Sequence, residues 1–92
     1  MLRPEFTSQF KKDYKRAVKR GLDPKKLEAV VTLLCNEQPL PPSCRDHVLT
    51  NSRNYKNVRE CHIQPDWLLV YKILPERLLL RLIRTGTHGD LF

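Results

Sequence analysis

Two very short connections in the last third of the chain constrain its fold more than any other feature. They join three runs of large apolar residues, at positions 58–63, 67–74 and 78–84. Each connection is a four-residue turn with a proline at its second position, Pro65 in one and Pro75 in the other, which suits a type I turn. Strands joined this closely pair as antiparallel neighbours. The sequence therefore predicts a three-stranded antiparallel meander.

The first third of the chain has helical spacing instead. Apolar residues at every fourth position predict one buried helix stripe, formed by Phe6, Phe10, Tyr14 and Val18. Thr7 or Ser8 is the predicted N-cap of this helix, and Gly21 is its predicted stop. Asp23 and Pro24 then open a second helix, whose predicted apolar face is formed by Leu27, Val30, Val31 and Leu34. A connection of a few residues places the two helices in an antiparallel hairpin.

These elements predict an α+β fold, in which an N-terminal helical hairpin packs on one face of a twisted antiparallel β-sheet. Residues 1–92 are expected to form one domain, because a chain of this length supports a single core. Residues 1–5 are typical of a short strand, which Pro4 would confine to a sheet edge. Residues 38–57 lack periodicity and predict a long loop of the kind that is often functional. The last eight residues are also expected to form a loop.

The chain carries an excess of basic residues. Seventeen Lys and Arg side chains stand against ten Asp and Glu, which gives a formal net charge of +7. A field of this sign favours RNA, DNA or an acidic protein segment as partner, although a basic surface without a partner has the same composition. The longest apolar run is too short to cross a membrane, and the N-terminus has no signal-peptide pattern. Three cysteines without paired spacing fit a reducing compartment, so we expect the protein in the cytoplasm.

All three histidines lie outside the predicted helices. His47 falls in the long loop, His62 in a strand and His88 in the tail. In the antiparallel meander, His62, Trp67 and Arg84 come to one end of the sheet. His88 follows Arg84 four residues later in the chain. Imidazoles transfer protons near neutral pH, and arginine binds phosphate through two parallel hydrogen bonds. Together these residues favour a site that acts on a phosphodiester.

Each of these residues also has a purely structural explanation. A single histidine on a strand is commonly a surface or core residue, Asp66 is typical of a turn, and Trp67 is typical of a core. A further alternative is a zinc site formed by Cys44, His47, Cys61 and His62. It is disfavoured because Cys61 and His62 are adjacent on a predicted strand and point to opposite faces. We therefore expect neither a metal nor a cofactor. The chain has no glycine-rich phosphate loop and no serine-nucleophile motif.

Three segments of the chain resemble one known family. They are RDHVL at 45–49, RECHIQPDWLLVYKI at 59–73 and RLIRTGTHGDLF at 81–92, and they resemble the YafQ branch of the RelE/ParE toxin superfamily. The resemblance extends over essentially the whole chain, through a basic first helix and the LEAVVTLL segment. It implies a RelE-like fold, similar to microbial RNases, and a toxin of a bacterial type II toxin–antitoxin system. The implied activity is ribosome-dependent endoribonuclease cleavage of mRNA, in which the RNA 2′-OH attacks the adjacent phosphate without a metal.

The resemblance also implies the site residues. The catalytic set is His47, His62, Asp66, Arg84 and His88, and the substrate-binding set contains Trp67 and Phe92. Arg59 and Arg81 are further residues that we expect to bind the substrate. His88 is expected to be the general acid, and Arg84 is expected to bind the phosphorane. The general base, or the group that orients it, is left open among His47, His62 and Asp66.

The expected partners follow from the same resemblance. Trp67 and Phe92 are expected to stack on or support the substrate bases, and the basic helices to meet ribosomal RNA through its phosphates. A cognate antitoxin with an acidic or flexible segment is expected to cover the basic surface, and operator DNA to be bound only through that complex. The alternative is a non-enzymatic member of the superfamily that binds DNA or poisons a protein such as gyrase. A third alternative is an inactive relic that binds only its antitoxin.

Overall fold

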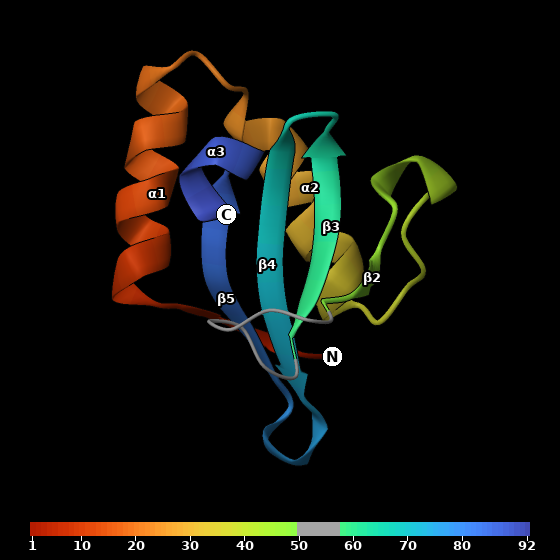
Figure 1. Cartoon of the computed structure of the whole chain (residues 1–92). Coiled ribbons are helices and arrows are strands. Elements are labelled where there is room, and N and C mark those ends of the chain that lie inside the picture. Colours follow the sequence, from red (N-terminus) through yellow and green to blue (C-terminus); the bar gives the residue numbers. More distant parts are fainter. Residues whose placement is uncertain (50–57) are drawn as a thin grey trace.

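Two long helices cover one face of a five-stranded sheet, and a short helix lies on the other face (Figure 1). The structure, a computed structural model, describes residues 1–49 and 58–92. The elements in chain order are β1 (Arg3–Phe6), α1 (Ser8–Lys19), α2 (Pro24–Cys35), η1 (Pro42–Cys44), β2 (His47–Val48), β3 (Arg59–Gln64), β4 (Trp67–Leu74), η2 (Pro75–Arg77), β5 (Leu79–Gly86) and α3 (His88–Leu91), where η marks a short 3₁₀ turn. The strand order in the sheet is β1-β5-β4-β3-β2.

The predicted meander is confirmed. β3 pairs with β4 and β4 pairs with β5, both in antiparallel orientation. A tight turn that contains Pro65 joins the first pair. The second pair is joined through η2, which ends at Leu78 in the left-handed conformation, with φ of 50°. The predicted α+β class, with a pair of helices against a sheet, therefore matches the structure.

The edges of the sheet were predicted only in part. The short edge strand expected near the N-terminus is confirmed as β1, which is the outermost strand on its side. β1 pairs with β5 in parallel, from Arg3 opposite Leu79 to Phe6 opposite Leu82, so the sheet is mixed rather than purely antiparallel. This pairing joins the two ends of the chain, and local sequence patterns carry no information about it. At the other edge, the region predicted as a loop contains β2, which pairs with β3. The rest of that predicted loop, residues 50–57, lies outside the described residues.

Both long helices begin as predicted. The Thr7 hydroxyl accepts a hydrogen bond from the backbone N–H of Phe10 at 3.2 Å, and the Asp23 carboxylate accepts one from the backbone N–H of Lys25 at 3.0 Å. Pro24 occupies the first turn of α2, where its missing N–H is not needed. The predicted apolar face of α2 is largely confirmed, because three of its four residues are buried: Leu27, Val30 and Leu34.

The buried stripe of α1 differs from the predicted every-fourth pattern. Its buried residues are Phe10, Asp13 and Ala17, whereas Phe6 and Val18 are exposed. A helix has 3.6 residues per turn, so a strict four-residue repeat drifts around its axis, while mixed spacings of three and four stay on one face. The burial of the charged Asp13 is explained below by its partner.

Two apolar clusters lie on opposite faces of the sheet. The larger one joins both long helices to the sheet and includes Phe10, Leu34, Leu69, Tyr71 and Leu82. The smaller one lies on the other face, here called the open face, and consists of Val58, Leu68, Val70 and Leu91, with Leu49 and Ile83 packed against it. Alternation along β4 sends successive side chains to the two clusters. Among the described residues, no helix has the length and apolar content needed to span a bilayer.

Candidate active site

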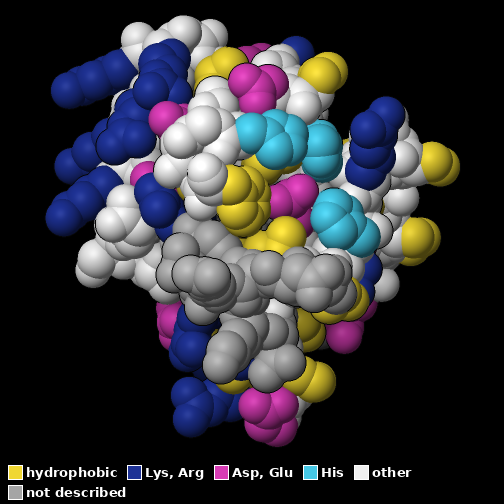
Figure 2. All heavy atoms as spheres, viewed as in Figure 1, with side chains coloured by type: hydrophobic (Ala, Val, Ile, Leu, Met, Phe, Trp, Pro, Cys, Tyr) yellow, Lys and Arg dark blue, Asp and Glu magenta, His cyan; other side chains and the backbone are white. Residues whose placement is uncertain are grey.

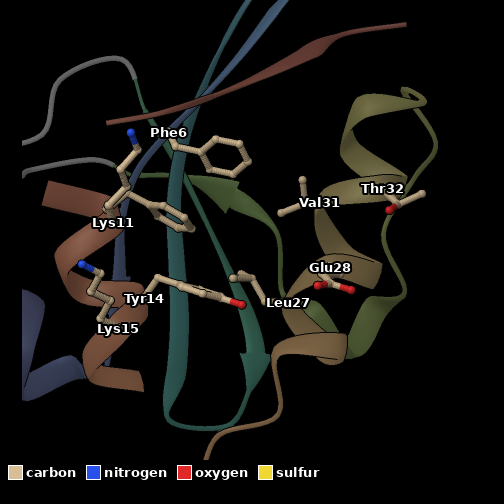
Figure 3. A pocket seen from close by; sticks show the side chains of 9 residues that line it. Phe6, Lys11, Tyr14, Lys15, Leu27, Glu28, Val31 and Thr32 are labelled. Carbon is tan, nitrogen blue, oxygen red and sulfur yellow. The ribbon is translucent and has the colours of Figure 1, made fainter. Parts of the chain in front are cut away.

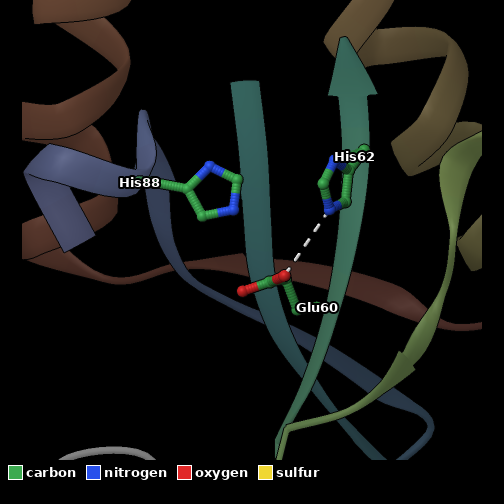
Figure 4. A group of neighbouring side chains, drawn as sticks. All are labelled: Glu60, His62 and His88. Atoms are coloured by element: carbon green, nitrogen blue, oxygen red, sulfur yellow. Dashed lines mark ion pairs between the residues drawn. The ribbon is translucent and has the colours of Figure 1, made fainter. Parts of the chain in front are cut away.

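Glu60 lies among the imidazole side chains on the open face. Its Oε1 atom is 3.6 Å from Nε2 of His47 and 3.7 Å from Nε2 of His62. The rings of His62 and His88 meet edge to face, with centroids 5.7 Å apart. Figure 2 shows the imidazoles gathered on this face, and Figure 4 shows Glu60, His62 and His88 directed toward one another. The three histidines therefore meet around a buried carboxylate that the sequence analysis did not single out.

β3 positions Glu60 and His62 by simple alternation. Residues two apart on a strand share a face, so both side chains point to the open face. Cys61, between them, is fully buried in the cluster on the helix-covered face. The strand register places Glu60 opposite Val70 and His62 opposite Leu68, and these two apolar residues form the floor of the site. The same alternation keeps Cys61 from sharing a metal ion with His62.

His88 is positioned by α3, a short helix in a segment that was predicted to be a loop. A capping box closes this short helix: the Thr87 hydroxyl accepts from the backbone N–H of Asp90 at 3.1 Å, and the Asp90 carboxylate accepts from the backbone N–H of Thr87 at 3.0 Å. The Asp90 carboxylate also pairs with Arg20 of α1 at 2.7 Å. Leu91 anchors the helix in the apolar cluster of the open face. Four residues are too few to show helical periodicity, so the prediction of a loop was wrong here.

Asp66, in the turn between β3 and β4, orients the His88 ring. Its Oδ1 atom accepts hydrogen bonds from the backbone N–H of His88 at 3.2 Å and from the ring Nδ1 at 3.1 Å. These hydrogen bonds lower the pKa of Asp66, so its carboxylate is ionised at neutral pH. Because Nδ1 of His88 donates to this carboxylate, Nε2 is the ring nitrogen that remains for the substrate.

β2 brings His47 to the cluster from the edge of the sheet. His47 is the register partner of Glu60, and its Nδ1 atom lies 2.6 Å from the backbone carbonyl of Arg45. A carbonyl oxygen can only accept, so Nδ1 carries a proton and Nε2 is directed at Glu60. Both nitrogens of the His47 ring are thus held in defined positions.

Arg84 lies in the same cross-strand row as Glu60, two strands away. Its Nε and Nη2 atoms donate to the two carboxylate oxygens of Asp13 at 2.9 and 3.0 Å. Burial alone would raise the pKa of Asp13, but hydrogen bonds from Arg84, Gln9 and the backbone of Thr85 lower it below its usual value. Both Asp13 and Arg84 are therefore charged. The forked edge of Arg84, predicted to bind the phosphorane, is engaged by Asp13, and Arg84 adds positive charge at the rim of the site.

Trp67 does not reach the surface. Its side chain is 2% exposed, and its indole N–H donates to the Thr85 hydroxyl at 2.8 Å. That hydroxyl in turn donates to the backbone carbonyl of Leu68 at 2.7 Å. A ring buried in this way cannot stack on a substrate base. Of the two roles predicted for Trp67, stacking on the bases and supporting the site, its position allows only the second. Phe92 differs, because its ring is 57% exposed directly after α3.

Arg59 and Arg81, the other predicted substrate contacts, lie away from the imidazoles. Arg59 is adjacent to Glu60 on β3, so alternation sends it to the helix-covered face, where it donates to Asp46. Arg81 of β5 forms an ion pair with Glu5 of β1, and its register partner on β4 is Lys72. Neither position supports the predicted contact with substrate.

The three cysteines do not take part in the cluster. All three are buried and free. Burial raises the pKa of Cys35 and Cys44, and raises that of Cys61 far above its usual range. A protonated thiol is a poor nucleophile and a poor metal ligand. The chemistry on the open face is therefore that of imidazoles and carboxylates.

Three side chains of the cluster could hold a metal ion. Glu60, His62 and His88 each offer one ligand atom, and these atoms lie within 4.8 Å of one another. Imidazole nitrogen and carboxylate oxygen are ligands typical of zinc and copper. The same atoms are the ones available to transfer protons. A bound metal ion and proton transfer by these groups would therefore exclude each other.

Two further surface features lie near α1. Basic side chains gather over this helix, as Figure 2 shows: Lys11, Lys12, Lys15, Arg16, Lys19 and Arg20, all exposed. Between α1 and α2 lies a groove of about 540 Å³, whose walls are largely apolar (Figure 3). Tyr14 lines it from α1, while Leu27 and Val31 line it from α2. Lys11 and Lys15 stand on its α1 side.

Solved structures with this fold define a class of protein, namely bacterial toxins. A metal-bound toxin from Helicobacter pylori is 47% identical and superposes with a TM-score of 0.93, covering 100% of both chains. The toxin in the E. coli DinJ–YafQ complex is 45% identical, with a TM-score of 0.88 over 100% of this chain and 99% of that one. The two-helix layer and the sheet of this chain therefore form the same fold as these toxins.

The family profile described as the YafQ toxin of bacterial type II toxin–antitoxin systems matches residues 2–92. The mRNA interferase toxin YafQ of Escherichia coli strain K12 is 46% identical over 89 residues, which is 96% of this chain and 92% of the relative. A putative toxin YafQ of Haemophilus influenzae is 34% identical and covers 97% of this chain and 90% of the relative. The chain belongs to the YafQ family of toxins of type II toxin–antitoxin systems. The resemblance drawn from its sequence is thereby confirmed.

Proposed function

We propose that the protein is an endoribonuclease that cleaves mRNA on the ribosome by attack of the RNA 2′-OH on the adjacent phosphate, without a metal. The observation that carries this proposal is the cluster of three imidazoles around Glu60 on the open face. Family membership supports it, since the curated E. coli relatives are named mRNA interferase toxins. The cytoplasm, where mRNA is translated, is the proposed location.

The reaction needs two proton carriers on opposite sides of one phosphate. The 2′ oxygen loses its proton and bonds to phosphorus, the bond from phosphorus to the 5′ oxygen breaks, and the 5′ oxygen takes up a proton. The products are a 2′,3′-cyclic phosphate and a 5′-OH. Each proton transfer contributes about 10²–10⁴ in rate when the carrier is well placed. The Glu60–His62 pair on β3 and His88 on α3 lie next to each other on the open face and are the two proposed carriers.

His88 is the proposed general acid. The Asp66 carboxylate accepts from Nδ1 of His88 and so fixes the ring orientation and leaves Nε2 to deliver a proton. This assignment gives Asp66 the role of orienting His88 rather than of a base, because its Oδ1 atom accepts both hydrogen bonds from His88.

Glu60 and His62 together form the proposed general base. Glu60 is buried, and its charge acts directly on the His62 ring at 3.7 Å, so a proton taken from the 2′-OH remains next to a carboxylate. His47 lies on the other side of Glu60. With a proton on Nε2 as well as on Nδ1, it is the proposed partner of the phosphorane oxygens, together with the charge of Arg84 at the rim. The sequence left the base open, and the buried carboxylate is what favours this choice.

The chemistry of the cleaved ends tests the proposal. RNA fragments cut in this way carry a 5′-OH, which polynucleotide kinase labels without prior phosphatase treatment. We expect such ends in mRNA bound to ribosomes, and we expect His88→Ala to lose cleavage by orders of magnitude while its thermal unfolding stays unchanged. Glu76→Ala, a change at an exposed acidic residue in η2, is the matched control. Full cleavage by His88→Ala, or intact transcripts together with halted replication, would reject the ribonuclease.

The proposed macromolecular partners use the surfaces near α1. The six basic side chains over α1 suit ribosomal RNA, because lysine and arginine displace counterions from phosphates. The proposed antitoxin segment is amphipathic, with apolar side chains for the groove between α1 and α2 and acidic ones for Lys11 and Lys15. Operator DNA would be contacted through the antitoxin. These proposals accord with the family, in which the E. coli YafQ structure contains DinJ.

One substitution separates the antitoxin proposal from the catalytic one. Val31→Glu places a charge in the groove, and we expect it to weaken capture by the antitoxin while RNA cleavage persists. Leu78→Glu, at an exposed apolar residue next to η2, is the control and should bind as the wild type does. Undiminished binding by Val31→Glu would place the antitoxin elsewhere.

A further inference from the structure

The segment that carries His47 is weakly held by the sheet itself. β2 has only two residues and lies at the sheet edge, where it pairs with β3 alone. Arg45, two residues before His47, adopts the left-handed conformation with φ of 49°, a backbone state that most side chains avoid. A strand this short supplies few ladder hydrogen bonds. Contacts outside the strand pairing must therefore contribute to the position of His47.

Asp46 supplies those contacts from the opposite face of the sheet. Its carboxylate accepts a hydrogen bond from the Tyr71 hydroxyl and two from Arg59, from Nη2 at 3.1 Å and from Nε at 3.3 Å. We call Asp46, Tyr71 and Arg59 the Asp46 clamp. Tyr71 is fully buried on β4 and is the register partner of Arg59 on β3, so the clamp ties the residue that precedes β2 to both β3 and β4. Burial and the neighbouring carboxylate raise the pKa of Tyr71, so its hydroxyl remains a donor.

The clamp and His47 are coupled through one peptide unit. Asp46 directly precedes His47, the first residue of β2, and the two side chains lie on opposite faces of the sheet. Asp46 contacts Tyr71 on the helix-covered face, while His47 is directed at Glu60 on the open face. The Arg45 carbonyl, on the other side of Asp46, accepts a hydrogen bond from Nδ1–H of His47. Release of Asp46 would therefore disturb both contacts of the imidazole.

We infer that the Asp46 clamp positions His47 beside Glu60, with Tyr71 and Arg59 acting from the face of the sheet that carries no imidazole. Asp46, Tyr71 and Arg59 are thus positioning residues that act through His47. The catalytic consequence rests on the proposed ribonuclease function, whereas the position of His47 can be measured without it. The placement also gives Arg59 a role different from the predicted contact with substrate.

The first experiment measures the ring of His47 directly. Tyr71→Phe removes one hydroxyl and keeps the buried ring, and Asp46→Asn keeps the shape of the side chain and removes its charge. In the wild type, ¹⁵N chemical shifts should show the proton of the neutral His47 ring on Nδ1. Both variants should shift it toward Nε2, the form that exposed imidazoles prefer, while the His88 signals stay unchanged. An unaltered His47 tautomer in both variants would overturn the inference, whether or not RNA is cleaved.

The second experiment is a double-mutant cycle on RNA cleavage. If the clamp acts through His47, Tyr71→Phe should lower kcat about tenfold at unchanged KM, and should have less than about a twofold effect in a His47→Gln background. Equal losses in both backgrounds would show a general structural role and reject the inference. Glu76→Gln serves as the control for Asp46→Asn, because Glu76 is exposed on η2, and it should cleave like the wild type. A wild type that cleaves no RNA would reject the proposed function, and the ¹⁵N experiment alone would then decide the positioning.

Discussion

Replacement of Thr85 by valine tests the buried polar chain that holds Trp67 in the core. Thr85 is 1% exposed, and its hydroxyl both accepts from the Trp67 indole N–H and donates to the Leu68 carbonyl. Valine has nearly the same shape, so packing is retained and the hydroxyl alone is lost. The indole N–H is then left buried without its partner.

The expected cost follows from that unpaired donor. A buried donor without a partner costs about 1–3 kcal/mol. The Leu68 carbonyl adds less, because a carbonyl has a second lone pair and is more often found under-satisfied. We therefore expect Thr85→Val to lower the free energy of unfolding by roughly 2–3 kcal/mol. In a domain of this size, each kcal/mol shifts Tm by about 4–8 °C, so Tm should fall by roughly 8–24 °C.

Urea unfolding followed by tryptophan fluorescence measures this cost, since Trp67 is the only tryptophan of the chain. Thr85→Ser is the matched control. It keeps the hydroxyl and loses one methyl group, which should cost about 0.8 kcal/mol. The expected order of stability is wild type, then serine, then valine. If the valine variant is as stable as the serine variant, the indole hydrogen bond contributes nothing measurable and the reasoning is wrong.

Three further predictions concern the open face. Glu60→Gln keeps the shape of the side chain but removes the charge of the proposed base partner. Cleavage should therefore fall about 10²-fold or more, while the thermal unfolding of the protein stays unchanged. Turnover at the wild-type rate would contradict the role of Glu60 in the base. Addition of Cu²⁺ or Zn²⁺ should inhibit cleavage reversibly, because an ion on Glu60, His62 and His88 occupies the groups proposed to carry protons. Calorimetry should show that the protein binds the ion and that His62→Gln weakens this binding. Equal binding by that variant would place the ion elsewhere. Arg20 and hydrogen bonds from Thr87 lower the pKa of Asp90 to about 2, so the stabilisation is complete above about pH 4 and is lost as the pH falls toward that pKa. Asp90→Asn should therefore lower Tm at pH 6 and converge with the wild type near pH 2, and a constant difference across this range would contradict the assignment.

Local patterns were sufficient for the central part of the fold. The two proline turns predict the meander because a short connection leaves antiparallel pairing as the only choice. Asp23 and Pro24 mark the start of α2 because their roles at a helix start depend only on neighbouring residues. The parallel pairing of β1 with β5 depends on contacts between the two ends of the chain, so no local pattern predicts it.

The site was predicted in part, and the omissions have physical reasons. Alternation along β3 contained the missing information, because Glu60 is two residues from His62 and Arg59 is three residues from it, which places Glu60 on the same face and Arg59 on the other. The Thr-x-x-Asp pattern at Thr87 was likewise a capping signal for α3. The engagement of Arg84 by a buried carboxylate of α1 could not be predicted, because it depends on how α1 packs against β5.

The division of the sheet into a helix-covered face and an open face has a consequence for how such a gene can change over time. The larger hydrophobic core lies on the helix-covered face of the sheet, whereas the imidazoles lie on the open face, over the smaller apolar cluster. On the proposed mechanism, a point mutation of one histidine would therefore abolish RNA cleavage and leave the fold intact. Loss of toxicity would then need only one mutation, and the resulting protein would remain folded and still present the groove between α1 and α2.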